Sequence, residues 1–145
     1  MYESLTRFIP LVEGDETYGV WFFDHEHTGT MDDPKQMPYV EYGRLAIDVE
    51  DAIYAFVNDH EEFGLRHYGD ILERNGLKWG IESMEAADVS ALDGRAVMAL
   101  LVGAVRAERF CDGALLRFFQ TGCIARWLRR LQELDDNRGA PASRA

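Results

Sequence analysis

The sequence has few cysteines, the residues that stabilise many small proteins through disulfides or bound metal ions. It contains two cysteines, Cys111 and Cys123, which lie in a region with helical periodicity. A continuous helix would hold them roughly 18 Å apart at 1.5 Å per residue, too far for a disulfide unless the chain folds back between them. Because no third cysteine or neighbouring histidine accompanies them, a zinc site is poorly supported. We therefore expect two buried free thiols.

Long apolar runs and familiar catalytic motifs are also missing. The main apolar run is Val97–Val105, nine residues, which is less than half of the roughly 20 needed to cross a bilayer. The first residues lack an apolar stretch of signal-peptide length. The sequence has no Gly-rich phosphate loop, G-x-S-x-G elbow or H-E-x-x-H pair. These absences favour a cytoplasmic, non-membrane protein. They lower the expectation of an enzyme without excluding one, and they indicate no cofactor.

Basic residues are scarce in the first two thirds of the chain. Residues 1–93 hold 21 acidic and 6 basic side chains, a balance of −15, whereas residues 94–145 hold 5 acidic and 9 basic, a balance of +4. Phosphate attraction needs a basic footprint, so direct nucleic-acid binding is not expected. The acidic residues of segment 1–93 either keep the protein soluble or form a surface that binds a protein partner with a basic surface. No particular oligomeric state follows.

The length and composition predict one globular domain. A chain of 145 residues that is 47% hydrophobic can bury one core and is too short to expect two. We expect this domain to span residues 1–134. Residues 135–145 are small and polar, which predicts a flexible C-terminal tail.

Hydrophobic periodicity predicts a mainly α fold with a minor β-hairpin. Apolar residues at helical spacing indicate helices near residues 44–59, 65–75, 113–120 and 124–134. The helix over 44–59 is clearly amphipathic, with Asp48, Asp51 and Asp59 on its polar side. Tyr18–Phe23 and Tyr39–Tyr42 are rich in aromatic and β-branched residues, which favours two short strands.

The apolar run from Val97 to Val105 predicts a central helix near residues 91–110, around which the other helices pack. A helix that is hydrophobic almost all round is surrounded by other elements. Yet Arg95, Arg106 and Arg109 fall within about 60° of one another at 100° per residue. Buried charges need partners. This arginine stripe therefore forms structural ion pairs, an anion or ligand site, or a protein interface, with structural pairing or simple exposure favoured.

The end of the central helix supplies the candidate ligand residues Arg106, Glu108, Arg109 and Asp112. Glu108 projects to a different side of the helix, and Asp112 is a candidate cap for the next helix. A guanidinium paired with a carboxylate can orient a polar ligand. If a ligand binds, we expect it beneath the loop His25–Pro38.

That loop belongs to a fifteen-residue connection, Asp24–Pro38, between the two expected strands. Loops of this length are commonly functional or disordered. His25 and His27 would share one face if the strand continued, and Asp32 and Asp33 offer oxygen atoms. Without a defined third ligand, a solvated strand end is favoured over a metal site.

Several segments carry a resemblance to a known family. They are Gly29–Thr30, Pro34–Tyr42, Ser83–Met84, Ala87–Ser90, and above all Gly103–Gly113, which contains the letters ERFCDG. Across most of its length the chain resembles a family of small bacterial proteins, domain of unknown function number six-five-zero-eight, often seen near mobile genetic elements. The resemblance implies a bacterial origin and a mobile-element setting. It supplies no activity, cofactor or catalytic residue.

Two functional hypotheses follow. The first is a non-enzymatic acidic interaction protein, in which Asp48, Asp51 and Asp59 engage a basic partner. In a mobile-element setting, this partner is a host defence protein whose nucleic-acid-binding surface the chain occupies as an inhibitor. The alternative is a small-ligand or nucleotide-binding or processing protein that uses the Arg106–Asp112 junction and the His25–Pro38 loop.

Overall fold

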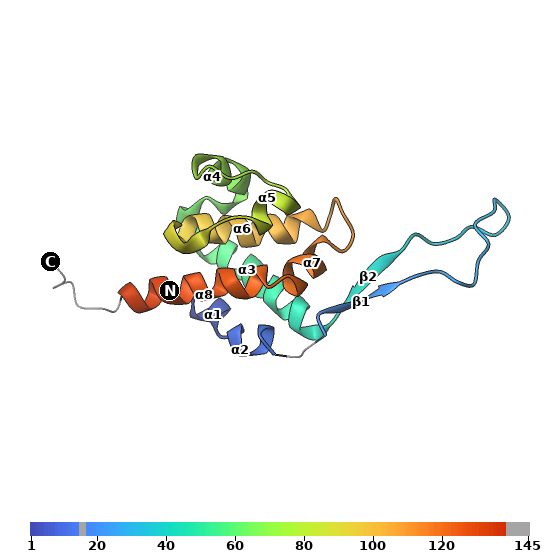
Figure 1. The fold of residues 1–145 in the computed structure, drawn as a ribbon, viewed down its shortest axis with the longest axis horizontal. Coiled ribbons are helices and arrows are strands. Elements are labelled where there is room, and N and C mark those ends of the chain that lie inside the picture. The colour runs from blue at the N-terminus through green and yellow to red at the C-terminus, as the bar shows by residue number, and fades with distance from the viewer. Residues whose placement is uncertain (15–16, 139–145) are drawn as a thin grey trace.

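The polypeptide forms a body of helices from which a two-stranded hairpin projects (Figure 1). The structure, a computed structural model, describes residues 1–14 and 17–138. Its α-helices are α1 (Glu3–Thr6), α2 (Ile9–Val12), α3 (Arg44–Asp59), α4 (Tyr68–Arg74), α5 (Ile81–Glu85), α6 (Gly94–Ala107), α7 (Ala114–Gln120) and α8 (Cys123–Arg138). The 3₁₀ helices are η1 (Glu61–Phe63), η2 (Leu65–His67) and η3 (Val89–Ala91). The strands are β1 (Gly19–Phe22) and β2 (Tyr39–Tyr42), which confirms a mainly α fold with a minor β-hairpin.

Helix α6 is the predicted central helix. Of its fourteen residues, twelve are buried, and Arg95 and Arg106 are the two exceptions. The helix begins later than expected because Asp93 caps it, accepting a hydrogen bond from the backbone N–H of Ala96 at 2.9 Å. Residues 89–91 form η3 instead. The predicted 91–110 span therefore shortens at both ends.

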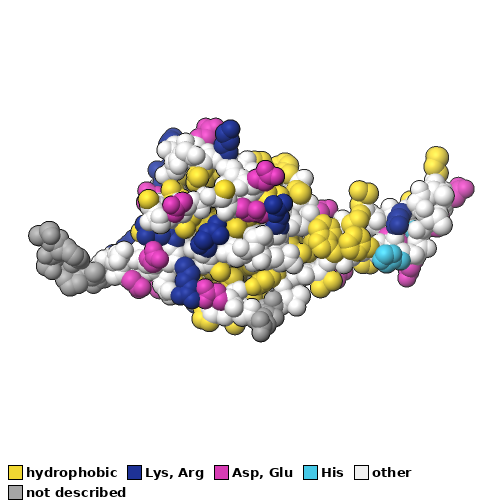
Figure 2. Space-filling model, viewed as in Figure 1, with side chains coloured by type: hydrophobic (Ala, Val, Ile, Leu, Met, Phe, Trp, Pro, Cys, Tyr) yellow, Lys and Arg dark blue, Asp and Glu magenta, His cyan; other side chains and the backbone are white. Residues whose placement is uncertain are grey.

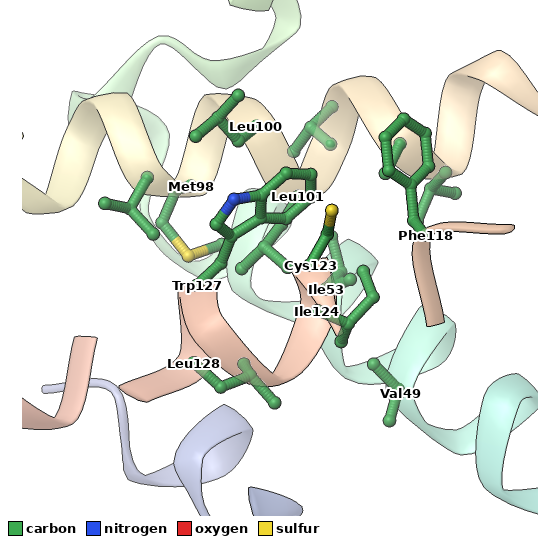
Figure 3. Packing of buried hydrophobic residues seen from close by; sticks show 14 of the residues in the cluster. Val49, Ile53, Met98, Leu100, Leu101, Phe118, Cys123, Ile124, Trp127 and Leu128 are labelled. Carbon is green, nitrogen blue, oxygen red and sulfur yellow. The ribbon is translucent and has the colours of Figure 1, made fainter. Parts of the chain in front are cut away.

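Neighbouring helices cover α6: it contacts α3, α4, α5, α7 and α8, together with η2. Figure 3 shows Leu101 of α6 close to Trp127 of α8, with Ile53 of α3 in the same group of buried side chains. Each of these side chains is almost fully buried. Burying one large apolar side chain contributes about 1.5–3 kcal/mol. The fold is therefore stabilised mainly by apolar packing against α6.

The amphipathic helix α3 has the predicted bounds. Its buried residues follow helical spacing and are Leu45, Ala46, Val49, Ile53 and Phe56. The predicted helix over 65–75 is instead divided into η2 and α4. It is flanked by Gly64 at φ 63° and Gly76 at φ 75°, a left-handed conformation that glycine adopts without steric cost.

Helix α8 continues four residues beyond the predicted domain boundary, so residues 135–138 are helical rather than part of a flexible tail. Asp135 explains the extension. Its carboxylate accepts hydrogen bonds from the Met1 ammonium at 3.0 Å and from the backbone N–H of Tyr2 at 2.8 Å. This contact joins distant parts of the sequence, which periodicity does not detect. The rest of the predicted tail, residues 139–145, lies outside the described residues.

The two cysteines differ in environment. Cys123 is buried, as expected, but Cys111 is exposed. The expectation for Cys111 is wrong because α6 ends at Ala107 and leaves this residue in the turn before α7. In the described part of the chain, no helix combines the length and apolar character needed to span a bilayer.

Gly94 allows the N-terminal segment to pack on α6. A Cβ atom at this position would lie 1.7 Å from the Tyr2 hydroxyl oxygen. Tyr2 is buried and stacks on Phe56, with ring centroids 5.6 Å apart. The ring therefore cannot swing away without losing this contact.

We predict that Gly94→Ala lowers the free energy of unfolding by about 1–3 kcal/mol through overpacking. Urea unfolding followed by tryptophan fluorescence measures the change. The control is Gly69→Ala in α4, where no atom lies within 4 Å of the added Cβ, and helix propensity favours alanine by about 0.5–1 kcal/mol. Equal stability of the wild type and Gly94→Ala would contradict the close packing.

Candidate functional site

The predicted ligand residues at the end of α6 do not gather beneath the loop. The loop lies at the far end of the projecting hairpin (Figure 1). Arg109 and Asp112 are exposed, and Arg106 and Glu108 are half-buried. The sequence places these four residues close together, but the structure gives them different surroundings.

Glu108 has a structural role at the junction between α6 and α7. Its carboxylate accepts hydrogen bonds from the backbone N–H groups of Gly113 and Leu115, both at 3.0 Å. These are free N–H groups at the start of α7, where a negative charge is favourable. The sequence predicts Asp112 as the cap of this helix, but Asp112 is exposed. The residue at the N-cap position is Gly113, which has no side chain to accept a capping hydrogen bond. Glu108 therefore caps this helix.

Tyr42 connects this junction to the hairpin. Its hydroxyl donates to Glu108 at 2.5 Å and accepts from the backbone N–H of Leu116 at 2.9 Å. Burial raises the pKa of Tyr42 well above its usual value, and the hydrogen bond to Glu108 adds to the effect. Trp21 packs against Gly113 at the same junction, because a Cβ on Gly113 would lie 2.3 Å from the Trp21 ring. Tyr42 and Trp21 thus fix the base of the hairpin to the body.

Beyond this base, the hairpin exposes large apolar side chains. We call residues 19–42 the arm. The strands pair antiparallel, with Gly19 opposite Tyr42 and Phe22 opposite Tyr39. Figure 2 shows hydrophobic side chains gathered where the arm leaves the body. The exposed apolar side chains of the arm are Val20 (62%), Trp21 (40%), Phe22 (37%), Phe23 (50%), Met31 (100%) and Met37 (78%).

These side chains lie on both faces of the arm. Side chains alternate along a strand, so Trp21 and Phe23 share one face, with ring centroids 6.0 Å apart. Phe22 lies on the other face with Tyr39, with centroids 4.9 Å apart. Strand periodicity predicts this alternation, but the sequence does not show that both faces project into solvent.

Asp24 organises the connection beyond β1. It is 5% exposed and accepts hydrogen bonds from the backbone N–H groups of Gln36, Glu26 and His27, and lies 2.9 Å from the His27 Nδ1. The N–H of Gln36, helped by His27, holds the pKa of Asp24 far below its usual value despite burial. The connection is therefore held by a buried carboxylate. Across the described residues, no three histidine, cysteine or acidic side chains form a group that could hold a metal ion.

The predicted partner-binding aspartates lie on α3, which follows the arm through Gly43. Asp51 and Asp59 are exposed, whereas Asp48 is half-buried and lies 3.0 Å from the Arg44 guanidinium. Residues 19–59 contain nine acidic and two basic side chains, a balance of −7. The arm and α3 are thus both acidic.

The predicted arginine stripe has three distinct environments. Arg95 is exposed, and its Nε donates to the backbone carbonyl oxygen of Phe63 at 2.7 Å rather than to a carboxylate. Arg109 is exposed near the end of α6. Arg106 lines a cavity of about 370 Å³ between α3, α4 and α6. Angular position on one helix could not predict these differences, because the neighbouring elements determine them.

We predict that Tyr42→Phe destabilises the protein by about 1–3 kcal/mol, because the buried N–H of Leu116 loses its acceptor and Glu108 loses a donor. Chemical unfolding at pH 7 measures the loss. Tyr39→Phe is the matched control, since the Tyr39 hydroxyl makes an exposed bond of 3.3 Å to Glu41, and a change within about 0.5 kcal/mol is expected there. Equal effects of the two substitutions would refute the anchoring role.

The raised pKa of Tyr42 also predicts a pH dependence. A raised pKa in the folded state gives stability that is complete below the unfolded value, near 10, and is lost as pH rises toward the folded value. The stability difference between the wild type and Tyr42→Phe should stay constant from pH 7 to 9. Above about pH 10 it should fall by up to about 1.4 kcal/mol per pH unit. A constant difference up to pH 11 would show that the hydroxyl ionises normally in the fold.

Comparison with known proteins identifies the family of this chain. The chain has no match among curated proteins and none among solved structures. One family model matches residues 2–137, a span that includes the arm, the Glu108 junction and the helices described above except the last residue of α8. The chain therefore belongs to the Family of unknown function (DUF6508).

Proposed function

We propose that this protein is a non-enzymatic protein-binding protein whose arm inserts apolar side chains into a partner with a basic surface. The observation that carries this proposal is the exposure of Val20, Phe22 and Phe23 on an arm that projects from the body. Large exposed apolar patches on a folded protein commonly mark interaction sites.

The physical chemistry of the arm supports a partner. A two-stranded hairpin is marginally stable alone in water, and this arm has neighbouring helices only near its base (Figure 1). Both of its edges carry unpaired backbone groups, which are available for further strand pairing. Exposed aromatic side chains such as Phe22 and Phe23 belong to a residue class that is enriched in protein interfaces.

The charge of the surrounding surface indicates the chemistry of the partner. The acidic arm and α3 would repel another acidic surface and attract a basic one, which speeds encounter and improves specificity. A nucleic-acid-binding surface has the required positive charge. The partner class that we propose is therefore a protein of this kind, and a host defence protein that binds nucleic acid is the candidate that the family resemblance suggests.

The alternative, a ligand site built from the whole Arg106–Asp112 junction, has less support. Glu108 already accepts hydrogen bonds from Tyr42, Gly113 and Leu115. Its carboxylate is thus not free to orient a ligand without uncapping α7.

The arm is tested with the double variant Val20→Ser/Phe23→Ser. Both side chains are at least half exposed, so we expect the variant to keep the wild-type helix content by circular dichroism. We expect it to bind the partner with a Kd at least tenfold higher than that of the wild type. The partner is first isolated from a lysate of the source organism and then purified for calorimetry. Leu11→Ser is the control, because Leu11 is equally exposed, at 48%, but lies on α2.

Two outcomes would overturn this proposal. One is partner binding that is equal for the double variant and the wild type. The other is self-association through the arm, seen by light scattering as a dimer that the double variant converts to a monomer, with no other protein bound.

The acidic face of α3 is tested by charge reversal. Asp48→Lys/Asp51→Lys/Asp59→Lys should weaken partner binding at least tenfold at low salt, with a smaller difference at high salt because salt screens exposed charges. A control with three charge reversals elsewhere, Glu73→Lys/Glu82→Lys/Glu133→Lys, has the same net charge and should bind better than the α3 variant. If the two triple variants bind equally, net charge alone acts and α3 is not part of the interface.

A further inference from the structure

We infer that the cavity beside Arg106 binds a small phosphorylated ligand, independently of the arm. The cavity lies between the C-terminal half of α3, η2, the start of α4 and the C-terminal half of α6. Five polar side chains converge on it from these four elements. They are Tyr54, Asn58, Arg66, Tyr68 and Arg106.

Arg106 is the main reason to expect an anion. It is one of the two residues of α6 that are not buried, and it is half-buried rather than free in water. Its counterpart Arg95 donates to a backbone carbonyl. In contrast, within residues 1–14 and 17–138 no hydrogen bond or ion pair involves the guanidinium of Arg106. A partly desolvated cation without a partner is unfavourable, and a bound anion would relieve that cost.

Arg66 brings a second guanidinium to the same cavity from η2. It too has no ion-pair partner in the described ranges of the chain, whereas Arg117, Arg129 and Arg130 each pair with a glutamate. Two arginines present planar donor groups that match the oxygen geometry of phosphate. The protein has a net charge of −11, so two arginines that line one cavity form a local site of positive charge in an acidic protein.

The remaining lining fits a ligand with a planar or apolar body. Tyr54 and Tyr68 line the cavity, and no hydrogen bond of the described residues uses either hydroxyl. The Tyr68 ring also contacts Trp79 edge-to-face, with ring centroids 6.1 Å apart. The apolar side chains of Leu65 and Val102 are buried beneath. Base rings and other planar groups stack on aromatic side chains. A volume of about 370 Å³ is within the range of small-molecule sites.

A second cavity of about 380 Å³ adjoins the first and shares Val57, Asn58, Leu65 and Arg66 with it. Glu61 and His67 line this second cavity. The Glu61 carboxylate would repel a phosphate there. The phosphate group therefore belongs in the first cavity beside Arg106, and the second cavity suits a neutral hydrogen-bonding part of the ligand.

Calorimetry with ADP, inorganic pyrophosphate and adenosine as probes tests this site. We expect saturable binding of ADP, weaker binding of pyrophosphate, and the weakest binding of adenosine, all at constant ionic strength. If neither phosphate compound binds saturably, or adenosine binds as tightly as ADP, the phosphate site is overturned. Pyrophosphate binding as tightly as ADP overturns the stacking role of Tyr54 and Tyr68.

Arginine variants locate the binding. Arg106→Gln and Arg66→Gln should each weaken ADP binding at least tenfold, whereas Arg74→Gln, an exposed arginine on α4 outside the two cavities, should bind as the wild type does. Arg66 is exposed, so its variant keeps the fold and remains informative if Arg106→Gln unfolds. Equal losses in Arg66→Gln and Arg74→Gln would show general charge attraction and overturn the site.

Discussion

The burial of α6 is the constraint on which the rest of the structure depends. A helix with twelve buried residues among fourteen must be covered on nearly every side, and α3, α4, α5, α7 and α8 provide this cover together with η2. The order of these elements along the chain then fixes where the loops lie. Arg95 and Arg106 are the only two residues of α6 that are not buried. Both lie on the side of the molecule that contains η1, η2 and the end of α3.

Much of this architecture is present in the sequence as local pattern. The bounds of α3 follow from its amphipathic spacing, and the hydrophobic run identifies α6 as the central helix, because both patterns report burial along one element. The ends of α6 are harder to predict from the sequence, because Ser90, another residue that can cap a helix, lies near Asp93. The extension of α8 depends on Asp135 binding the N-terminal residues, a long-range contact that no periodicity contains.

The functional residues are less predictable because their roles depend on partners from other elements. Glu108 reads as a surface carboxylate, yet it caps α7 and holds Tyr42, a residue 66 positions away. The sequence distinguishes Arg106 by its place on an apolar helix, but Arg66, which lines the same cavity, lies on a different helix and has no distinguishing pattern. Asp24 is the exception. An aspartate directly after a strand is a common turn residue, so its bonds to nearby N–H groups were open to prediction.

The arm is joined to the body at one end and extends away from it (Figure 1). The hairpin meets the body through Tyr42 and Trp21 near one end, while the residues around Met31 lie at the other end. If that tip stands about 30 Å from the base, a rotation of about 10° at Tyr42 displaces it by about 5 Å. A substitution at the anchor that turned the arm by this angle would therefore shift the tip by more than the width of a side chain. The position of the tip thus depends on residues at the base as well as on residues of the tip itself.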